Sequence, residues 1–171
     1  MSAREDLPVP GSVEQILAHA AQRAERMGLG YAGAVTPQEA HRLREEGVAA
    51  IVDVRTEPEY VQVGRVPGTP RIEWPRSGDR AELAAFLAAV RGRFAPTEKL
   101  LLICRSGVRS HYAAELLAHA GYEGAYNVLE GFEGEYGAGT NGWRAAGLPC
   151  ERGYRVSRRG EPGHLAVENY W

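Results

Sequence analysis

Cysteine is scarce in this sequence, and its scarcity excludes two classes of protein. The chain of 171 residues holds two cysteines, Cys104 and Cys150, which are too few for a disulfide scaffold and lack metal-ligand spacing. The histidines show no ligand or triad spacing, so we expect neither a metal nor another cofactor. Two free thiols suit a reducing cytosol, which predicts a cytoplasmic location.

Long apolar runs and an excess of one charge are also missing. The N-terminus has no apolar run, so we expect no signal peptide, and no stretch reaches the length that spans a membrane. A formal net charge of -2 gives no electrostatic reason to expect nucleic acid or a membrane surface as a partner. With 44% hydrophobic residues and no internal repeat, the chain suits one globular domain with extensions.

The most informative stretch that is present runs from Leu100 to Ser110. Leu100 to Ile103 is continuously apolar, which predicts a strand that is buried on both faces. Cys104 and a polar Arg-Ser-Gly loop follow this strand. A helical pattern then begins, with apolar residues at Val108, Tyr112, Ala113, Leu116, Leu117 and Ala120.

This order of strand, cysteine, loop and helix predicts a reactive thiol. A loop before a helix N-terminus aims several backbone N–H groups at one point, and such nests bind anions. Arg105 and Arg109 add positive charge there, so we expect Cys104 to be largely thiolate near neutral pH and to act as a nucleophile. A lone cysteine at a strand end is more often a packing residue, but the arginines, Gly107 and the helix favour the reactive role.

Several segments, in their order along the chain, resemble single-domain rhodaneses, which are sulfurtransferases. Cys104 to Ser110 (CRSGVRS) resembles the active-site loop of that family. The other matching segments are Ile51 to Thr56 with Glu59-Tyr60, Gly64 to Gly68, Tyr126 to Gly131 and Gly142 to Pro149. The resemblance covers about Ala34 to Pro149. Within the family, the chain is similar to a bacterial rhodanese-like subgroup with an added N-terminal helix.

The chain departs from the family pattern at three places. Arg65 stands where a histidine is usual, and the stretch from Tyr60 to Gly64 is one residue longer. Phe132 stands where a second glycine is common. These departures concern the turn geometry and leave the cysteine loop unchanged.

Strands that alternate with helices predict an α/β fold with a mainly parallel sheet and helices on both faces. The resemblance implies the five-stranded rhodanese-like version of this fold. The expected organisation is an N-terminal tail and amphipathic helix over 1–30, a rhodanese domain over 31–150 and a C-terminal tail over 151–171. We expect the N-terminal helix to pack on the domain, with a dimer contact as the alternative. Strands are expected at 33–35, 48–54, 71–74, 100–103 and 126–129, and helices at 12–27, 37–46, 57–61, from Asp79 to before Pro96, and 108–120.

Asp53 and Arg55 are the expected supporting residues. They end the strand over 48–54, and ligands collect at strand ends in parallel sheets. Asp53 is expected to hold the cysteine loop or Arg55, although a plain turn role is almost as plausible. The family resemblance implies a structural pair of Arg55 with Glu59.

The resemblance implies a thiosulfate sulfurtransferase. Cys104 would take the outer sulfur of thiosulfate or a related donor, release sulfite and hold the sulfur as a persulfide. Arg109 is the expected organiser of the loop, and Arg105 the rim residue that meets the donor. A thiophilic acceptor (cyanide, a small thiol or a thioredoxin-like protein) would then take the sulfur. The expected substrate-binding residues are Arg105, Ser106, Gly107, Val108 and Arg109.

Two other classes stay open at this point. Cysteine-dependent phosphatases and arsenate reductases also place a cysteine before an anion nest and an arginine. Four residues separate Cys104 from Arg109, whereas the related phosphatases of this fold have five, so the shorter loop favours a single terminal sulfur atom. The third class is a persulfide-carrying interaction module, and the presence of Cys104 argues against a module without chemistry.

Overall fold

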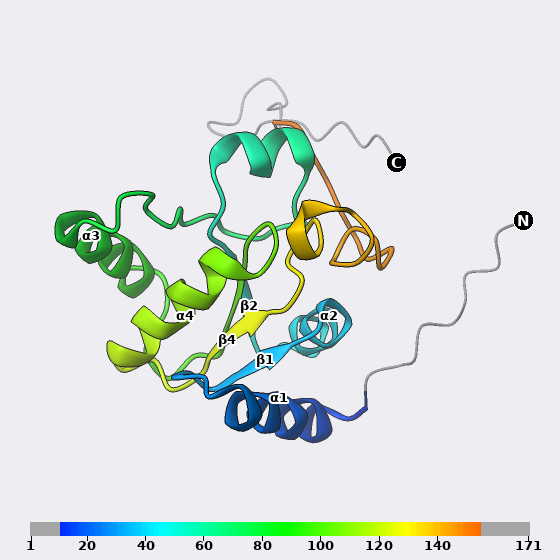
Figure 1. The fold of residues 1–171 in the computed structure, drawn as a ribbon, viewed down its shortest axis with the longest axis horizontal. Helices are drawn as coiled ribbons and strands as arrows, with labels where there is room; N and C mark the ends of the chain where they lie inside the picture. Colours follow the sequence, from blue (N-terminus) through cyan, green and yellow to red (C-terminus); the bar gives the residue numbers. More distant parts are fainter. Residues whose placement is uncertain (1–10, 155–171) are drawn as a thin grey trace, which may run out of the picture.

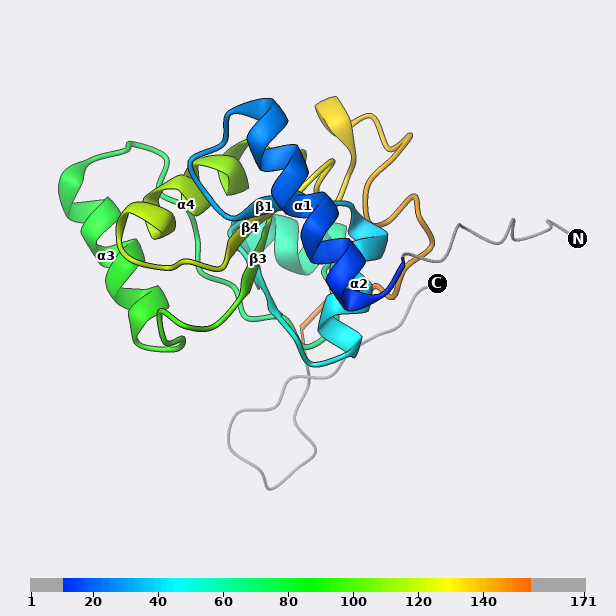
Figure 2. The same cartoon turned by 90° about the horizontal axis from the view of Figure 1, so that it is seen from below.

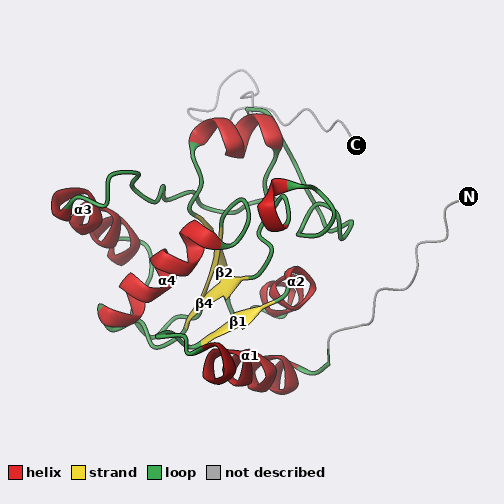
Figure 3. Ribbon diagram, viewed as in Figure 1, coloured by secondary structure: helices red, strands yellow, loops and turns green. Residues whose placement is uncertain are grey.

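Four parallel strands form the central sheet of the described part of the chain, residues 11–154 of a computed structural model (Figures 1 and 3). The strands are β1 (Gly33–Val35), β2 (Ala50–Asp53), β3 (Leu100–Ile103) and β4 (Ala125–Val128), in the order β1-β4-β3-β2. The strand that carries Cys104 at its end is therefore central. Leu102 of β3 pairs with Val52 on one side and with Asn127 on the other.

Helices cover both faces of this sheet, as the sequence predicts. They are α1 (Val13–Met27), α2 (Pro37–Glu45), α3 (Arg80–Arg91) and α4 (Val108–His119). Figures 1 and 2 show α3 and α4 on one side of the strands and α1 and α2 on the other. Because side chains alternate along a strand, Leu100 and Leu102 pack in one core and Leu101 and Ile103 in the other.

Helix α1 packs on the domain, which confirms the first of the two expectations for it. Ser12 and Gln15 form a capping box at its start. The buried positions of α1 are Ile16, Ala20 and Ala24, whereas Met27 at its end is exposed. The outer parts of the expected terminal segments, residues 1–10 and 155–171, lie outside the described residues.

The strand expected over 71–74 is reduced to a single parallel bridge between Asp53 and Arg71. Its backbone runs beside β2, since the N–H groups of Ile72 and Trp74 donate to carbonyls at the end of that strand. Proline precedes and follows this stretch, and proline has no N–H to donate. The sheet therefore has four strands instead of five within residues 11–154.

The longer stretch between Tyr60 and Gly64 forms a π-helix, η1 (Glu59–Val63), instead of the short helix expected over 57–61. The N–H of Gly64 donates to the carbonyl of Glu59 at 3.2 Å, which closes the wide turn. A π-helical turn accommodates one inserted residue. Arg65, at the histidine position, is buried and forms an ion pair of 3.2 Å with Glu151.

Candidate functional site

Cys104 follows the central strand β3, and its side chain is 1% exposed. The loop after it ends at Gly107, which is the N-cap of α4 and has a φ of 96°. This left-handed conformation favours glycine, because a Cβ would be strained there. It turns the Gly107 N–H back toward Cys104, and the nitrogen lies 3.1 Å from Sγ.

A second polar group reaches the sulfur from the buried face of α4. Ser110 Oγ lies 3.1 Å from Cys104 Sγ and 2.6 Å from Asn127 Oδ1. The amide nitrogen of Asn127 donates to the carbonyl of Gly107 at 3.1 Å. The hydroxyl of Ser110 has one proton, so it can donate either to Asn127 or to the sulfur. A thiol suits the first arrangement and a thiolate suits the second.

Sequence reasoning missed Asn127 of β4, and it missed Ser110 because it placed the buried face of α4 partly wrongly. Val108 and Tyr112 are 60% and 52% exposed, although the helical pattern predicts them to be buried. The buried positions of α4 are Ser110, Ala113, Ala114 and Leu117. Ser110 is in helical phase with this small-residue face, and that phase was the available signal.

Arg109 forms an ion pair with Glu59 of η1. Its two terminal nitrogens donate to the two carboxylate oxygens of Glu59, each at 2.7 Å. Burial opposes the charge of Glu59, but the hydrogen bonds and charge of Arg109, with Thr56, lower the pKa of Glu59 to about 2. The hydrogen bonds to Glu59 also raise the pKa of Arg109. The two charged groups therefore stay ionised together.

The expected pairing between the side chains of Arg55 and Glu59 is wrong. Arg55 forms a fully buried ion pair with Asp53, with a shortest N···O distance of 2.7 Å, and donates to the carbonyl of Gly64 at 2.7 Å. The ring of Phe132 lies against the guanidinium, 4.5 Å from Cζ. Of the roles considered for Asp53, the structure therefore shows the pairing with Arg55. Phe132, at the usual glycine position, stacks on this pair.

Arg105 is at the rim of the loop, but it is not free. Its side chain is half-exposed and forms an ion pair of 3.1 Å with Glu133. Gly137 packs closely on it, since a Cβ at Gly137 would lie 2.6 Å from the guanidinium. A carboxylate therefore already balances the charge that was expected to meet the donor. Ser106 is half-buried, and Val108 is exposed on the outer side of α4.

The segment after β4 supports the cysteine loop from behind. The N–H of Phe132 donates to the carbonyl of Cys104 at 2.8 Å, and the N–H of Glu133 donates to that of Arg105 at 2.9 Å. Gly131 allows this contact, because a Cβ there would lie 2.6 Å from the Cys104 carbonyl. The loop is therefore held both by β3, which it follows in the chain, and by the segment after β4.

A cavity of about 400 Å³ adjoins the loop through Arg109. Its lining includes Glu59 from η1 and Trp74 and Arg76 from the segment before α3. Cys150 packs against the core on the α1 and α2 side of the sheet, whereas Cys104 belongs to the α3 and α4 side. Burial raises the pKa of the Cys150 thiol to about 11.

Two further classes of feature are absent from the described part of the chain. Residues 11–154 contain no group of three or more histidine, cysteine or acidic side chains that is arranged to hold a metal ion. None of the helices within the same range has the length and apolar character needed to cross a membrane.

The sequence matches a known protein family. The family model of the rhodanese-like domain matches residues 36–136. An uncharacterized protein of Rickettsia conorii is 34% identical over 109 residues, which cover 60% of this chain and 83% of that protein. The thiosulfate sulfurtransferase GlpE of Pseudomonas aeruginosa is 33% identical over 99 residues, with 58% of this chain and 79% of that protein covered.

A solved structure is similar to this chain as well. The crystal structure of Rv0390 from M. tuberculosis is similar with a TM-score of 0.61 and 39% identity. The similarity covers 72% of this chain and 99% of that chain. It therefore extends beyond the segment that matches the family model.

Proposed function

Since this chain belongs to the family of rhodanese-like domains, we propose that it is a sulfurtransferase in which Cys104 carries the transferred sulfur. One observation supports this function above the others. The buried Sγ of Cys104 has the Gly107 N–H and the Ser110 hydroxyl at 3.1 Å each, so the site offers two donors to a sulfur anion. The similarity to GlpE of P. aeruginosa favours thiosulfate as the donor.

The proposed reaction has two displacement steps. The Cys104 thiolate attacks the outer sulfur of thiosulfate, the S–S bond of the donor breaks, and sulfite leaves with that electron pair. Cys104 is left as an anionic persulfide. An acceptor then attacks the outer sulfur and restores the thiolate. Cyanide would leave as thiocyanate, and a small thiol or a thioredoxin-like protein would leave as a persulfide.

The surrounding residues have distinct proposed roles. The loop 105–109 holds the persulfide, with the Gly107 N–H as the donor nearest to the cysteine. Arg109 keeps the loop in place through Glu59, and Asp53 with Arg55 supports the strand end behind it. Arg105 ties the loop to Glu133. The proposed setting is the cytoplasm, because both cysteines are free thiols.

Mass spectrometry of the intact protein tests this function. After treatment with thiosulfate, the protein should gain the mass of one sulfur atom, and cyanide should remove it as thiocyanate. Cys104→Ala should abolish the adduct. Cys150→Ser is the matched control and should retain it, because Cys150 packs on the other side of the sheet.

A protein that keeps its unmodified mass in saturating thiosulfate would contradict thiosulfate as the donor. If the adduct formed on Cys150 or needed both cysteines, the single-cysteine scheme would be wrong.

A further inference from the structure

A groove of about 880 Å³ lies between α3 and the segments that precede and follow η1. Apolar side chains from both sides line it, including Ile72 and Phe86. Charged side chains line it as well, and these are Arg71, Glu73, Arg76, Glu82 and Arg93. A volume of this size accommodates a small molecule.

Two of these arginines have unused guanidinium groups. Arg71 donates to the carbonyl of Arg55 at 3.3 Å, and Glu82 accepts a hydrogen bond from Ser77. The guanidinium groups of Arg76 and Arg93, in contrast, form neither an ion pair nor a hydrogen bond with any residue in the range 11–154. With three arginines against two glutamates, the lining has an excess of one positive charge.

The groove continues toward Cys104. It shares Thr56, Pro75 and Arg76 with the smaller cavity beside the cysteine loop, whose lining includes Arg109. Arg76 therefore belongs to both spaces. Because Cys104 is almost fully buried, a reactant must reach its sulfur through space that adjoins the loop, and this connected space meets the loop at Arg109.

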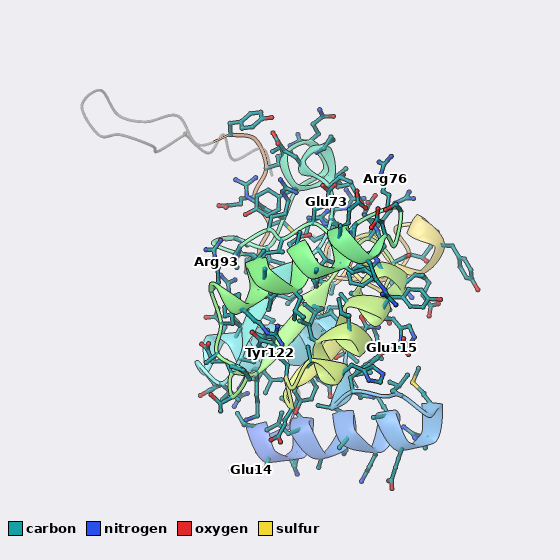
Figure 4. The ribbon with its side chains drawn as sticks, turned by 90° about the vertical axis from the view of Figure 1, so that its left-hand side faces the viewer. Glu14, Glu73, Arg76, Arg93, Glu115 and Tyr122 are labelled. Atoms are coloured by element: carbon teal, nitrogen blue, oxygen red, sulfur yellow. The ribbon has the colours of Figure 1, made fainter. Side chains whose placement is uncertain are left out.

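The two arginines mark the two ends of the groove. Arg76 precedes α3 and Arg93 follows it, and Figure 4 shows them at opposite ends of this helix. A helix of 12 residues is about 18 Å long. A molecule whose sulfur lies at the cysteine loop must therefore be about as long as α3 to place an anionic group at Arg93.

We propose that this groove binds the sulfur acceptor, and that the acceptor is an extended thiol with anionic groups far from its sulfur. The proposal rests on the sulfurtransferase function above. Its thiolate attacks the outer sulfur of the Cys104 persulfide, the S–S bond breaks, and Cys104 leaves as the thiolate. The acceptor keeps the sulfur as its own persulfide, so no oxidant or reductant is needed. Arg76 and Arg93 bind its anionic groups.

Kinetics with thiols of different length test the proposal. The probes are 2-mercaptoethanol, which is uncharged, glutathione, which is anionic and reaches about 11 Å as an extended tripeptide, and coenzyme A, which is anionic and longer. We expect Arg93→Gln to raise the KM for coenzyme A about three- to fivefold and to leave that for glutathione unchanged. Arg76→Gln should raise both KM values, and neither variant should affect 2-mercaptoethanol.

Arg80→Gln is the matched control. Arg80 is an exposed arginine of the same helix that does not line the groove, so its loss should change none of the three KM values. Persulfide formation from thiosulfate should be unchanged in Arg93→Gln and Arg80→Gln, because neither residue lines the cavity beside the cysteine loop. If Arg80→Gln and Arg93→Gln had equal effects, the change in KM would follow from the loss of overall charge and not from the groove. That outcome would overturn the proposal.

A binding measurement separates the groove from the reaction. S-methyl-coenzyme A has no reactive thiol, and NMR should show that it shifts amide resonances of α3 and of residues 71–76. Arg93→Gln should weaken this binding about three- to fivefold. If these resonances do not move at millimolar ligand, the groove proposal is wrong even in a protein that transfers sulfur. If they move in a protein that forms no persulfide, the sulfurtransferase function is wrong instead.

Discussion

At the scale of single residues, Ser110 is the side chain that contacts the sulfur of Cys104. Its hydroxyl lies between Cys104 Sγ and Asn127 Oδ1, and it has one proton for two acceptors. When Cys104 is a thiol, the chain of donors can run from Cys104 through Ser110 to Asn127. When Cys104 is a thiolate, Ser110 donates to the sulfur, and the contact with Asn127 loses its proton.

We predict that Ser110→Ala slows sulfur transfer through Cys104. The variant removes a hydrogen-bond donor beside the sulfur, and kcat for sulfur transfer should fall about tenfold, which corresponds to roughly 1.4 kcal/mol. Ser106→Ala is the control, because it makes the same change at a half-buried position of the same loop. Equal kcat values for Ser110→Ala and the unmodified sequence, measured with thiosulfate and cyanide, would contradict this role.

Gly107 offers a test of the backbone donor. Gly107→Ala places a Cβ at a φ of 96°, with ordinary contacts of 3.5 Å or more, so its cost is backbone strain of about 1–2 kcal/mol. Because relief of that strain turns the N–H away from Cys104, we expect persulfide formation to slow at least tenfold. Gly121→Ala is the control, since Gly121 has a φ of 100° and open space around it. Equal activities of the two variants, measured with thiosulfate and cyanide, would exclude the donor role.

At the scale of secondary structure, the ion pair of Arg109 with Glu59 joins two elements that are distant in the sequence. The π-helix η1 presents Glu59, and the first turn of α4 presents Arg109. Their bidentate contact joins the start of α4 to η1, next to the Gly107 N–H that donates to the sulfur. Thr56 holds the same carboxylate from the other side, with its hydroxyl donating at 2.9 Å.

We predict that the ion pair makes stability depend on pH in the acidic range. The folded-state pKa of Glu59 is about 2, below its ordinary value of 4.5. A lowered pKa means that the stabilisation is fully present above pH 4.5 and is lost as the pH falls toward 2. Glu59→Gln should cost about 2 kcal/mol near neutral pH and should lose less stability than the parent between pH 4.5 and 2.

Urea denaturation at pH 7, 5, 4 and 3 measures this difference. Glu46→Gln is the control, because Glu46 pairs with Arg42 on an exposed side of α2 at 3.0 Å and should contribute little. Parallel stability curves for the parent and Glu59→Gln across the acidic range would show that Glu59 is not stabilised in the folded state.

The sheet separates the two thiols at the scale of the whole molecule. Cys104 packs with the core under α3 and α4, and Cys150 packs against the core under α1 and α2. A disulfide requires the two Cα atoms to lie within about 7 Å. The fold therefore opposes a role of Cys150 as a resolving thiol for Cys104.

We predict that mild oxidation of the folded protein with diamide gives no Cys104–Cys150 disulfide. Mass spectrometry of tryptic peptides without reduction should show the two cysteines on separate peptides. The same treatment in urea is the control, because the unfolded chain can bring the thiols together. A linked peptide from the folded protein would contradict the separation of the two cores.

The sequence alone determined the local parts of the site. Four apolar residues gave β3 its residue range, and the polar loop before a helical pattern gave the start of α4 at Val108. The helix caps Ser12, Thr36 and Asp79 are local in the same way, since each capping side chain bonds to the backbone only two or three residues away. These features depend on neighbours in the chain, and residue type is sufficient to indicate them.

Only the tertiary structure decided which distant residues became partners. Glu59 was expected beside Arg55, four residues away, but its carboxylate binds Arg109, fifty residues away. Ser110 meets Asn127 because α4 packs on β4, and the same packing exposes Val108 and Tyr112. Several carboxylates and arginines are chemically equivalent as ion-pair partners, so the sequence pattern does not choose among them. The choice follows from the way that the helices and η1 sit on the sheet, which brings some charges within 3 Å and separates others.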